Sequence, residues 1–164
     1  MRHTIAILLQ NESGALSRVA SMFSTRGYNI ESLSVAPTQD PMLSRLTLVS
    51  EGDDAVIEQI AKQLYKLIDV VDVMDITLVD HVERELMMIK CRLKDRIKDV
   101  LLKFIREEEG KIISEVDGFI IFEIMSDYDS NNRILKTVEN MAEVIAVARS
   151  GPLALAKGQT AKSL

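Results

Sequence analysis

Hydrophobic residues in the first half of the chain follow two spacings, one typical of strands and one typical of helices. Runs that alternate in polarity or are apolar throughout predict strands, and runs with apolar residues at i, i+3, i+4 and i+7 predict helices. The helical spacing begins at Leu16 and stops near Gly27, and it returns after Asp53, a residue type that caps helix N-termini. The predicted strands are Arg2–Leu9, Glu31–Ala36, Leu43–Ser50 and Val70–Val79.

The second half repeats this order of spacings after the polar segment Asp80–Glu85. Helical spacing follows Asp95 as far as Gly110 and resumes at Ser126 or Asp127. The pair Asp117-Gly118 stands between two strand-like runs and is a strong signal for a two-residue hairpin. After Gly151-Pro152 the tail Lys157–Leu164 is predicted to be loose. The predicted strands are Leu86–Leu93, Lys111–Val116, Phe119–Met125 and Glu143–Arg149.

The order strand, helix, strand, strand, helix, strand occurs in both halves and predicts an α+β protein. We expect two ferredoxin-like βαββαβ domains, residues 1–80 and 81–164, each an antiparallel sheet with its helices on one face. Strands of the first domain are apolar on both faces, as Leu8 opposite Ile5 and Ile7 illustrates. A second sheet or a side-by-side dimer is therefore expected to cover the face that the helices leave open.

Composition excludes several classes of function. The net charge of −5 and the aromatic content of 4% argue against a nucleic-acid-binding protein, which would be basic and would carry stacking platforms. No apolar run approaches the ~20 residues of a membrane helix. The single cysteine, Cys91, cannot form an internal disulfide, and its apolar neighbours predict a buried filler. A reducing cytoplasmic location is expected.

The most informative stretch is Asn11–Arg18, where the chain leaves a strand, turns at Gly14 and enters a helix. The first turn of a helix has N–H groups without internal partners and a partial positive charge, which together suit a small anion or a carboxylate. Gly14 allows close approach of a ligand to the backbone. A second interpretation is purely structural: Asn11 and Ser13 only cap the helix, and Gly14 only makes the turn.

Catalytic and metal-binding patterns are not found in the sequence. His3 and His81 have no neighbouring residues with metal-ligand spacing, and no nucleophile–base pair or glycine-rich phosphate loop is present. Glu83 and Glu85 could form a pair of carboxylates, but Arg84 nearby makes ordinary surface ion pairs the favoured interpretation. We therefore expect no catalytic residue and no metal site in this chain.

Two segments near the N-terminus carry a family resemblance. Asn11-Glu12-Ser13-Gly14-Ala15-Leu16-Ser17-Arg18 and the run from Phe23 to Ala36 resemble an amino-acid-binding ACT domain. More closely, they resemble the small regulatory subunits of acetolactate synthase, also called acetohydroxyacid synthase. The likeness continues at Ser44-Arg45-Leu46-Thr47, Gln63–Val70, Val82-Glu83-Arg84-Glu85-Leu86 and Ala148-Arg149-Ser150-Gly151.

The resemblance implies a cytoplasmic, non-catalytic subunit that forms a homodimer and binds a branched-chain amino acid, usually valine. Residues 1–80 would bind the effector and dimerise, and residues 81–164 would form a second regulatory domain. The partner would be the large catalytic subunit, which holds thiamine diphosphate, magnesium and FAD, whereas this chain would hold no cofactor. The implied effector positions are Asn11, Gly14, Asn29 and Ala36, with Ala15, Leu16 and Ile30 beside them.

The residues themselves fit such a ligand. Backbone N–H groups of Gly14, Ala15 and Leu16 could take its carboxylate, the amides of Asn11 and Asn29 could accept from its ammonium, and apolar side chains, Leu33 among them, could cover its side chain. The helix-one loop of one chain is expected to face Asn29 and Ile30 of the other.

Three other functions compete with this interpretation; the net charge of −5 weighs against the second and the missing nucleophile–base pair against the third. The chain could be a stand-alone ACT-type sensor that regulates another enzyme. It could be an RNA-binding ferredoxin-like module, which would need aromatic residues and positive charge on its central strands. It could also be a small enzyme on this fold, because a fold does not fix a function.

Overall fold

The computed structural model of the chain describes residues 1–158. The chain divides into two units: unit 1 comprises Met1–Val82 together with Pro152 and the segment after it, and unit 2 comprises Glu83–Gly151. The boundary lies two residues beyond the division expected after residue 80, and the segment after Pro152 groups with unit 1 instead of unit 2. Residues 159–164 of the tail expected to be loose lie outside the described residues.

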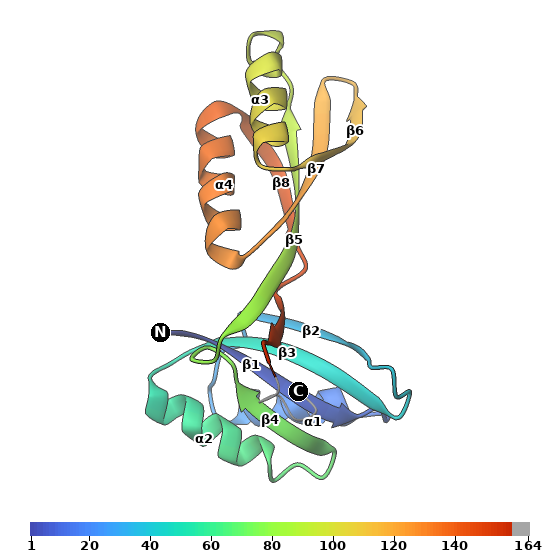
Figure 1. Cartoon of the computed structure of the whole chain (residues 1–164), viewed down its shortest axis with the longest axis vertical. Coiled ribbons are helices and arrows are strands. Elements are labelled where there is room, and N and C mark those ends of the chain that lie inside the picture. The colour runs from blue at the N-terminus through green and yellow to red at the C-terminus, as the bar shows by residue number, and fades with distance from the viewer. Residues whose placement is uncertain (159–164) are drawn as a thin grey trace. The chain divides into compact units, whose positions relative to one another are not determined.

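Unit 1 is a four-stranded antiparallel sheet with two helices, in the predicted order (Figure 1). The strand order β2-β3-β1-β4 places β2 and β4 at the edges. Its elements are β1 (Arg2–Gln10), α1 (Ala15–Thr25), β2 (Ser32–Pro37), β3 (Leu43–Glu51), α2 (Asp54–Leu64) and β4 (Val70–Asp75). The last strand is shorter than predicted because a turn follows it, in which the Val79 N–H donates to the Ile76 carbonyl at 3.1 Å.

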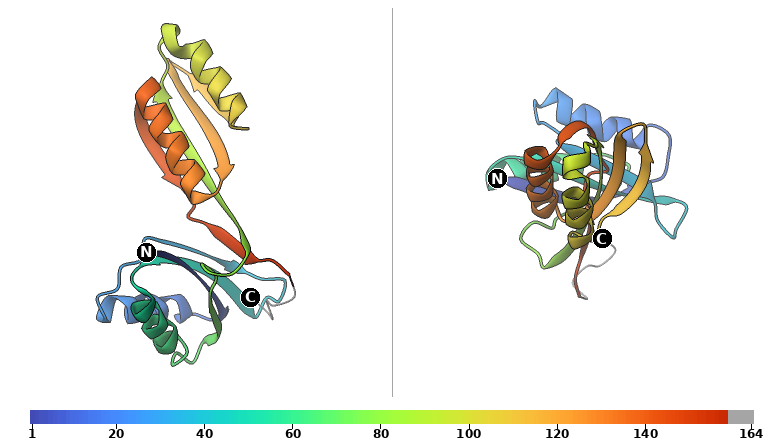
Figure 2. Two further views of the ribbon diagram at one scale, coloured as in Figure 1. Left: turned by 60° about the vertical axis from the view of Figure 1, so that its left-hand side comes forward. Right: turned by 90° about the horizontal axis from the view of Figure 1, so that it is seen from above.

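Both helices of unit 1 pack on the same face of the sheet, as expected (Figure 2). Val19 and Phe23 of α1 and Ile60 of α2 are almost fully buried against Ile7 and Leu46 of the central strands. Burial of side chains of this size stabilises the fold by roughly 1.5–3 kcal/mol each. The start of α1 is thereby fixed at the end of β1.

The opposite face of this sheet is partly covered by the chain itself. Strand β9 (Leu153–Ala156), which the sequence did not predict, places Ala154 against Ala6, Leu8 and Ile76 in a small core cluster. These residues are therefore buried within the chain, and no second sheet or dimer partner is needed to cover them. Exposed apolar surface is found instead on the edge strand β2, where Val35 is 39% exposed.

Unit 2 repeats the architecture, with strand order β6-β7-β5-β8 and both helices on one face (Figure 2). The two-domain α+β prediction is thus confirmed. Asp117 and Gly118 both have positive φ, as the predicted hairpin requires. The elements are β5 (His81–Arg92), α3 (Asp95–Glu107), β6 (Lys111–Val116), β7 (Phe119–Ser126), α4 (Tyr128–Met141) and β8 (Glu143–Arg149).

Two local predictions in unit 2 were wrong. Strand β5 begins at His81, so the segment 80–85, interpreted as a polar break, is mostly strand with alternating exposure. The left-handed residue after α3 is Glu109, with φ 56°, instead of Gly110. Gly110 is required for space, because a Cβ there would lie 2.9 Å from Ile105 Cγ2 and 3.1 Å from the Glu123 carbonyl oxygen.

Cys91 is a buried member of the unit 2 core, as predicted. Burial raises the pKa of its thiol to about 11, so the reactive thiolate is strongly disfavoured at neutral pH. Within residues 1–158, no helix is both long enough and apolar enough to cross a membrane.

Candidate functional site

The corner between β1 and α1 is the candidate site. Gly14 is the N-cap residue of α1, it has a left-handed backbone with φ 88°, and no side chain caps the helix there. The purely structural interpretation, in which Asn11 or Ser13 caps α1, is therefore wrong. The N-termini of α2 and α4 differ, since Asp53 accepts from the Val56 N–H and Asp127 from the Ser130 N–H.

Gly14 is needed for two reasons at this corner. A residue with a side chain is strained at φ 88°, and a Cβ would lie 3.0 Å from Nη1 of Arg18. The Arg18 guanidinium donates two hydrogen bonds to the buried carboxylate of Asp69, one of them from Nη2 to Oδ1 at 2.8 Å. These bonds hold the pKa of Asp69 below its usual range and raise that of Arg18. The pair ties the first turn of α1 to the start of β4.

Asn11 makes a set of hydrogen bonds that fixes its position. Its backbone N–H donates to the Met42 carbonyl at 2.7 Å. In the side chain, Nδ2 donates to the Pro41 carbonyl at 2.9 Å and Oδ1 accepts from Ser44 Oγ at 3.0 Å. An amide has two N–H bonds and two lone pairs on its oxygen. One of each therefore stays available for a ligand.

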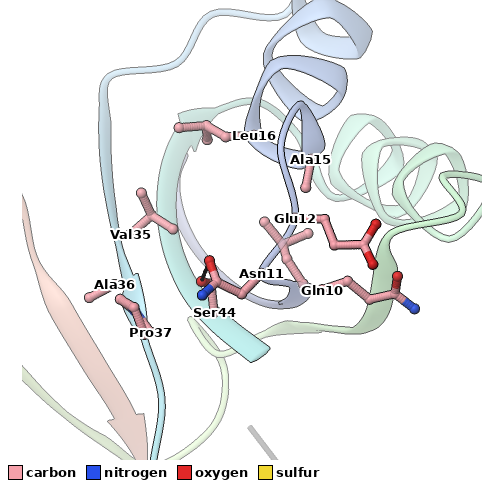
Figure 3. A pocket seen from close by; sticks show the side chains of 10 residues that line it. Gln10, Asn11, Glu12, Ala15, Leu16, Val35, Ala36, Pro37 and Ser44 are labelled. Atoms are coloured by element: carbon pink, nitrogen blue, oxygen red, sulfur yellow. Dashed lines mark hydrogen bonds between the residues drawn. The ribbon is translucent and has the colours of Figure 1, made fainter. Parts of the chain in front are cut away.

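A pocket of about 240 Å³ opens beside this corner (Figure 3). Side chains of α1 lie on one side, those of β2 lie across from them, and the hydrogen-bonded pair Asn11 and Ser44 lies between. Pockets for drug-sized ligands run from ~300 to 1,000 Å³, so this one suits a smaller metabolite. Its lining residues are Leu9, Gln10, Asn11, Glu12, Ala15, Leu16, Val35, Ala36, Pro37 and Ser44.

The structure brings together only part of the predicted effector set. Asn11, Ala15, Leu16 and Ala36 line the pocket, and Gly14 lies on the backbone between them. Asn29 and Ile30 do not line it. Asn29 is held by Ser50, at the opposite end of β3 from Ser44. Six residues of strand separate these ends by about 20 Å.

The backbone donors at the helix start are fewer than the sequence suggested. The Ala15 N–H donates to the Glu12 carbonyl at 3.2 Å, which makes it a poor partner for a ligand. Arg18 donates to the Gly14 carbonyl at 3.0 Å and begins the regular helical bonding. The N–H groups of Leu16 and Ser17 have no acceptor within the helix, as in the first turn of any α-helix. They are the donors best placed for a carboxylate.

Sequence reasoning missed several pocket residues. Glu12 belongs to the same corner, and its carboxylate adds a negative charge that suits an ammonium group. Val35 lines the pocket in place of Leu33, which packs against the unit 1 core, as does Ile30. Ser44 comes from β3 and is brought there by its pairing with Leu9 and Pro37. All three lie in segments that carry the family resemblance, Glu12 within Asn11–Arg18, Val35 within the run from Phe23 to Ala36 and Ser44 in Ser44-Arg45-Leu46-Thr47.

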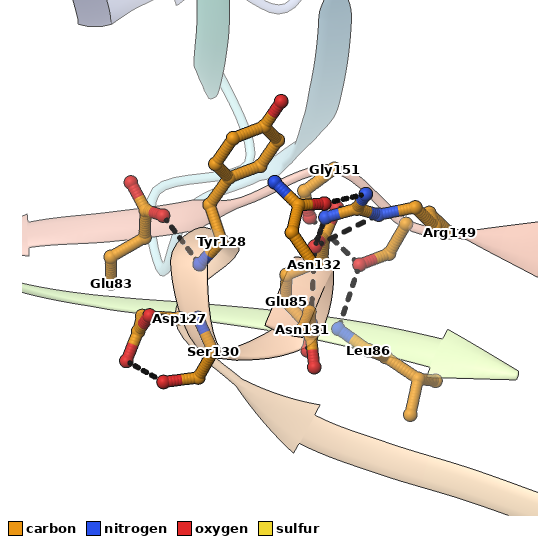
Figure 4. A network of polar contacts seen from close by, with 11 residues as sticks. Glu83, Glu85, Leu86, Asp127, Tyr128, Ser130, Asn131, Asn132, Arg149 and Gly151 are labelled. Atoms are coloured by element: carbon orange, nitrogen blue, oxygen red, sulfur yellow. Dashed lines mark hydrogen bonds and ion pairs between the residues drawn. The ribbon is translucent and has the colours of Figure 1, made fainter. Parts of the chain in front are cut away.

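Unit 2 contains a second polar constellation, centred on the buried carboxylate of Glu85 (Figure 4). Glu85 is 3% exposed and accepts from Arg149 Nη2 at 2.5 Å and from Asn131 Nδ2 at 3.1 Å. Arg149 also donates to Asn132 Oδ1 at 2.7 Å and lies over the Tyr128 ring. The prediction of a surface ion pair for Glu85 was therefore wrong.

A metal centre is not found within residues 1–158. No cluster of three or more His, Cys, Asp or Glu side chains is placed there to hold a metal ion. The candidate chemistry of the described chain is thus recognition at the β1–α1 corner, by backbone N–H groups, the Asn11 amide and the Glu12 carboxylate.

Comparison with known families matches each half of the chain to a described domain. Residues 5–72 match the family described as "AHAS small subunit-like ACT domain". Residues 84–158 match the family described as "Small subunit of acetolactate synthase". The two matches together span most of the chain, with one in each half.

Curated proteins and solved structures agree with these matches. The chain is 42% identical to the acetolactate synthase isozyme 3 small subunit of Escherichia coli (strain K12), over 96% of this chain and 97% of that protein. It is 37% identical to a probable acetolactate synthase small subunit of Archaeoglobus fulgidus, over 96% and 98%. The crystal structure of the acetolactate synthase small subunit from Thermotoga maritima superposes with a TM-score of 0.86 at 34% identity, covering 98% of this chain and 99% of that one.

Proposed function

Because the chain belongs to the family of acetolactate synthase small subunits, we propose that it senses a branched-chain amino acid and regulates a catalytic large subunit. Valine is the proposed effector, bound at the β1–α1 corner. The observation that carries this proposal is a pocket at an uncapped, glycine-bearing helix start within an ACT domain. The subunit would activate its partner and would impose feedback inhibition when valine accumulates.

The pocket offers a complementary group for each part of an amino acid. The carboxylate would accept from the Leu16 and Ser17 N–H groups, where the helix dipole also favours negative charge. The ammonium would lie toward the Glu12 carboxylate and the remaining lone pair of Asn11 Oδ1. An isopropyl group would be covered by Leu16, Val35 and Ala36. One methylene alters such burial by only ~1–3 kcal/mol, so leucine and isoleucine would compete modestly.

We propose that Asn29 and Ile30 complete the site from a second copy of the chain. Strand β2 is an edge strand with an exposed apolar residue, Val35, and an edge of this kind can pair with its own copy. In a two-fold dimer the paired strands run antiparallel, so opposite ends of the two strands meet. The partner's Asn29 would then lie beside the Ala36 end of the first chain.

The other members of the proposed complex follow from the family. The large subunit would carry thiamine diphosphate, magnesium and FAD and would condense pyruvate with pyruvate or 2-oxobutyrate in the cytoplasm. This chain would hold none of those cofactors. Valine binding would reach the reaction only through contacts between subunits.

An acetolactate assay across a valine titration, with and without this chain, tests the proposal. Addition of the chain should raise the activity of the catalytic subunit, and valine should then lower it in a saturable way. The catalytic subunit alone should respond weakly to valine. If the chain neither co-purifies with the catalytic subunit nor changes its activity, a stand-alone ACT-type sensor becomes the better account.

A further inference from the structure

Two buried serines stand at the two ends of strand β3, on the face that the helices cover. Ser44, Leu46, Leu48 and Ser50 lie on one face of the strand because they alternate along it. The two leucines are fully buried in the unit 1 core, whereas Ser44 is 6% exposed and Ser50 is 0% exposed. A buried hydroxyl is destabilising unless it finds a hydrogen-bond partner. The hydrogen-bond partners of these two hydroxyls therefore show which segments each serine holds in place.

Each serine holds one of the two asparagines of the proposed effector site. Ser44 Oγ donates to Asn11 Oδ1 at 3.0 Å, and Ser50 Oγ donates to the Asn29 backbone carbonyl at 2.7 Å. The Pro41 carbonyl can only accept, so the nitrogen of the Asn11 amide must face it and the oxygen must face Ser44. The Pro41 carbonyl thus fixes which way the Asn11 amide faces, and the Ser44 hydroxyl holds its oxygen in place.

The second serine acts on the backbone instead of a side chain. Asn29 lies in residues 28–30, which form neither helix nor strand between the end of α1 and the start of β2. Beside the Ser50 bond, this segment is tied to β3 by the Glu31 N–H, which donates to the Val49 carbonyl at 2.9 Å. Loss of the Ser50 hydroxyl would leave the Asn29 carbonyl without this acceptor bond and the segment held by its flanking bonds at Tyr28 and Glu31.

We propose that Ser44 and Ser50 are positioning residues for the effector, an inference that rests on the proposed function. Ser44 orients the Asn11 amide at one end of β3, and Ser50 orients the Asn29 segment at the other. In the proposed dimer these two ends serve different pockets, so a single strand contributes to both sites. Each complete site needs Ser44 from one chain and Ser50 from its partner.

Calorimetric titration with valine tests the single variants. Ser44→Ala and Ser50→Ala should each weaken valine binding about tenfold, the effect of one lost hydrogen bond to a ligand-binding group. Ser13→Ala is the matched control, because Ser13 lies in the same corner, is exposed and does not cap α1; its affinity should be unchanged. Ser44→Thr keeps the hydroxyl and should recover most of the affinity. Activation of the catalytic subunit without valine should stay at the wild-type level in the Ser13→Ala control.

A mixed dimer tests whether the two serines serve different pockets. Differently tagged Ser44→Ala and Ser50→Ala chains would be combined and the mixed species isolated. One pocket then has both serines and the other has neither, so half of the sites should bind valine with wild-type affinity. If both serines acted on the same chain's pocket, every site would be weakened about equally, which would overturn the shared arrangement.

The outcomes separate this inference from the function on which it rests. Wild-type protein that does not bind valine would refute the proposed function. Wild-type protein that binds valine, with Ser44→Ala and Ser50→Ala binding as tightly as Ser13→Ala, would refute the positioning role alone. A fall in the urea midpoint of Ser44→Ala that matches its loss of affinity, without recovery in Ser44→Thr, would also refute it.

Discussion

The two units place a helix after their first strand in the same topological position, but the two corners differ. In unit 1 the corner runs from Asn11 to Gly14 and ends in a left-handed glycine beside a pocket. In unit 2 only Leu93 and Lys94 separate β5 from α3, and Lys94 is an extended N-cap with φ −105°. The Leu93 N–H is already bound to the Gly118 carbonyl at 2.7 Å. Neither α1 nor α3 has a side-chain cap, so the two corners differ in loop length and backbone conformation, and the longer corner of unit 1 lies beside a pocket.

The use of polar groups differs in the same way. Glu85, Arg149 and Asn131 of unit 2 bind mainly to one another, so the cluster contributes to folding. Asn11 and Glu12 of unit 1 keep hydrogen-bonding capacity on an open pocket. Substitutions in unit 2 should therefore change stability, whereas substitutions at the unit 1 corner should change valine binding.

The largest expected effect on stability is at Glu85. Glu85→Ala removes the carboxylate that Arg149 binds, although Asn131 keeps the residue 85 carbonyl and Arg149 keeps Asn132 as acceptors, and it should lower the free energy of unfolding by about 3 kcal/mol, near the lower end for a broken buried pair. The lower end applies because the Arg149 side chain is 26% exposed. Urea denaturation with hydrogen exchange of the β5 amides measures this effect. Glu143→Ala removes the half-exposed Arg92–Glu143 pair and should lower the free energy of unfolding by less than about 1 kcal/mol. Equal losses of stability in the two variants would contradict this difference between the pairs.

Gly14→Asp should have the largest effect on binding. The new side chain meets Arg18 and places a negative charge where the effector carboxylate would lie, so valine affinity should fall at least about a hundredfold, or ~2.7 kcal/mol. Gly118→Asp is the matched control: Gly118 has φ 77° with nothing within 4 Å of an added Cβ, and it lies in unit 2. Both variants share the backbone strain of about 1–2 kcal/mol. Wild-type affinity in Gly14→Asp would remove this corner from the site.

Helix caps provide a smaller contrast, between the starts of α1 and α4. Asp127→Ala removes the acceptor for the Ser130 N–H and should destabilise the protein by about 1 kcal/mol. Ser13→Ala at the uncapped start of α1 should leave the thermal midpoint unchanged. A similar loss in both variants would show that Ser13 caps α1 in solution.

The smallest expected effect is the acid dependence of Asp69. Its pKa is lowered in the folded protein by hydrogen bonds from Arg18, so its stabilising contribution is complete above the ordinary value of 3.8 and is lost as the pH falls through the folded value. Asp69→Asn should therefore lose less stability than the wild type between pH 5 and pH 2, as thermal midpoints across that range would show. Parallel decline of the two proteins would contradict this role.

The sequence predicted the elements well because their signals are local. The spacings at Leu16 and after Asp53 identified α1 and α2, and Asp117-Gly118 identified the hairpin. Strand β9 was missed because it is short and is recognisable only through the packing of Ala154 on Ala6 and Leu8.

The pocket residues that were predicted come from one contiguous stretch, apart from Ala36, which the family resemblance supplied. Asn11, Ala15 and Leu16 come from one stretch, and the structure brings them together at one pocket. Ser44 and Val35 reach the same pocket through strand register, which a single sequence does not display. The burial of Glu85 depends on Arg149, a partner 64 positions along the chain.

The central claim is that the bare corner of unit 1 binds the effector. A crystal structure of the full chain with saturating valine tests it most directly. The account predicts valine density between α1 and β2, with the carboxylate at the Leu16 and Ser17 N–H groups and the partner's Asn29 close by. Density for valine elsewhere, with the pocket beside Asn11 empty, would contradict it.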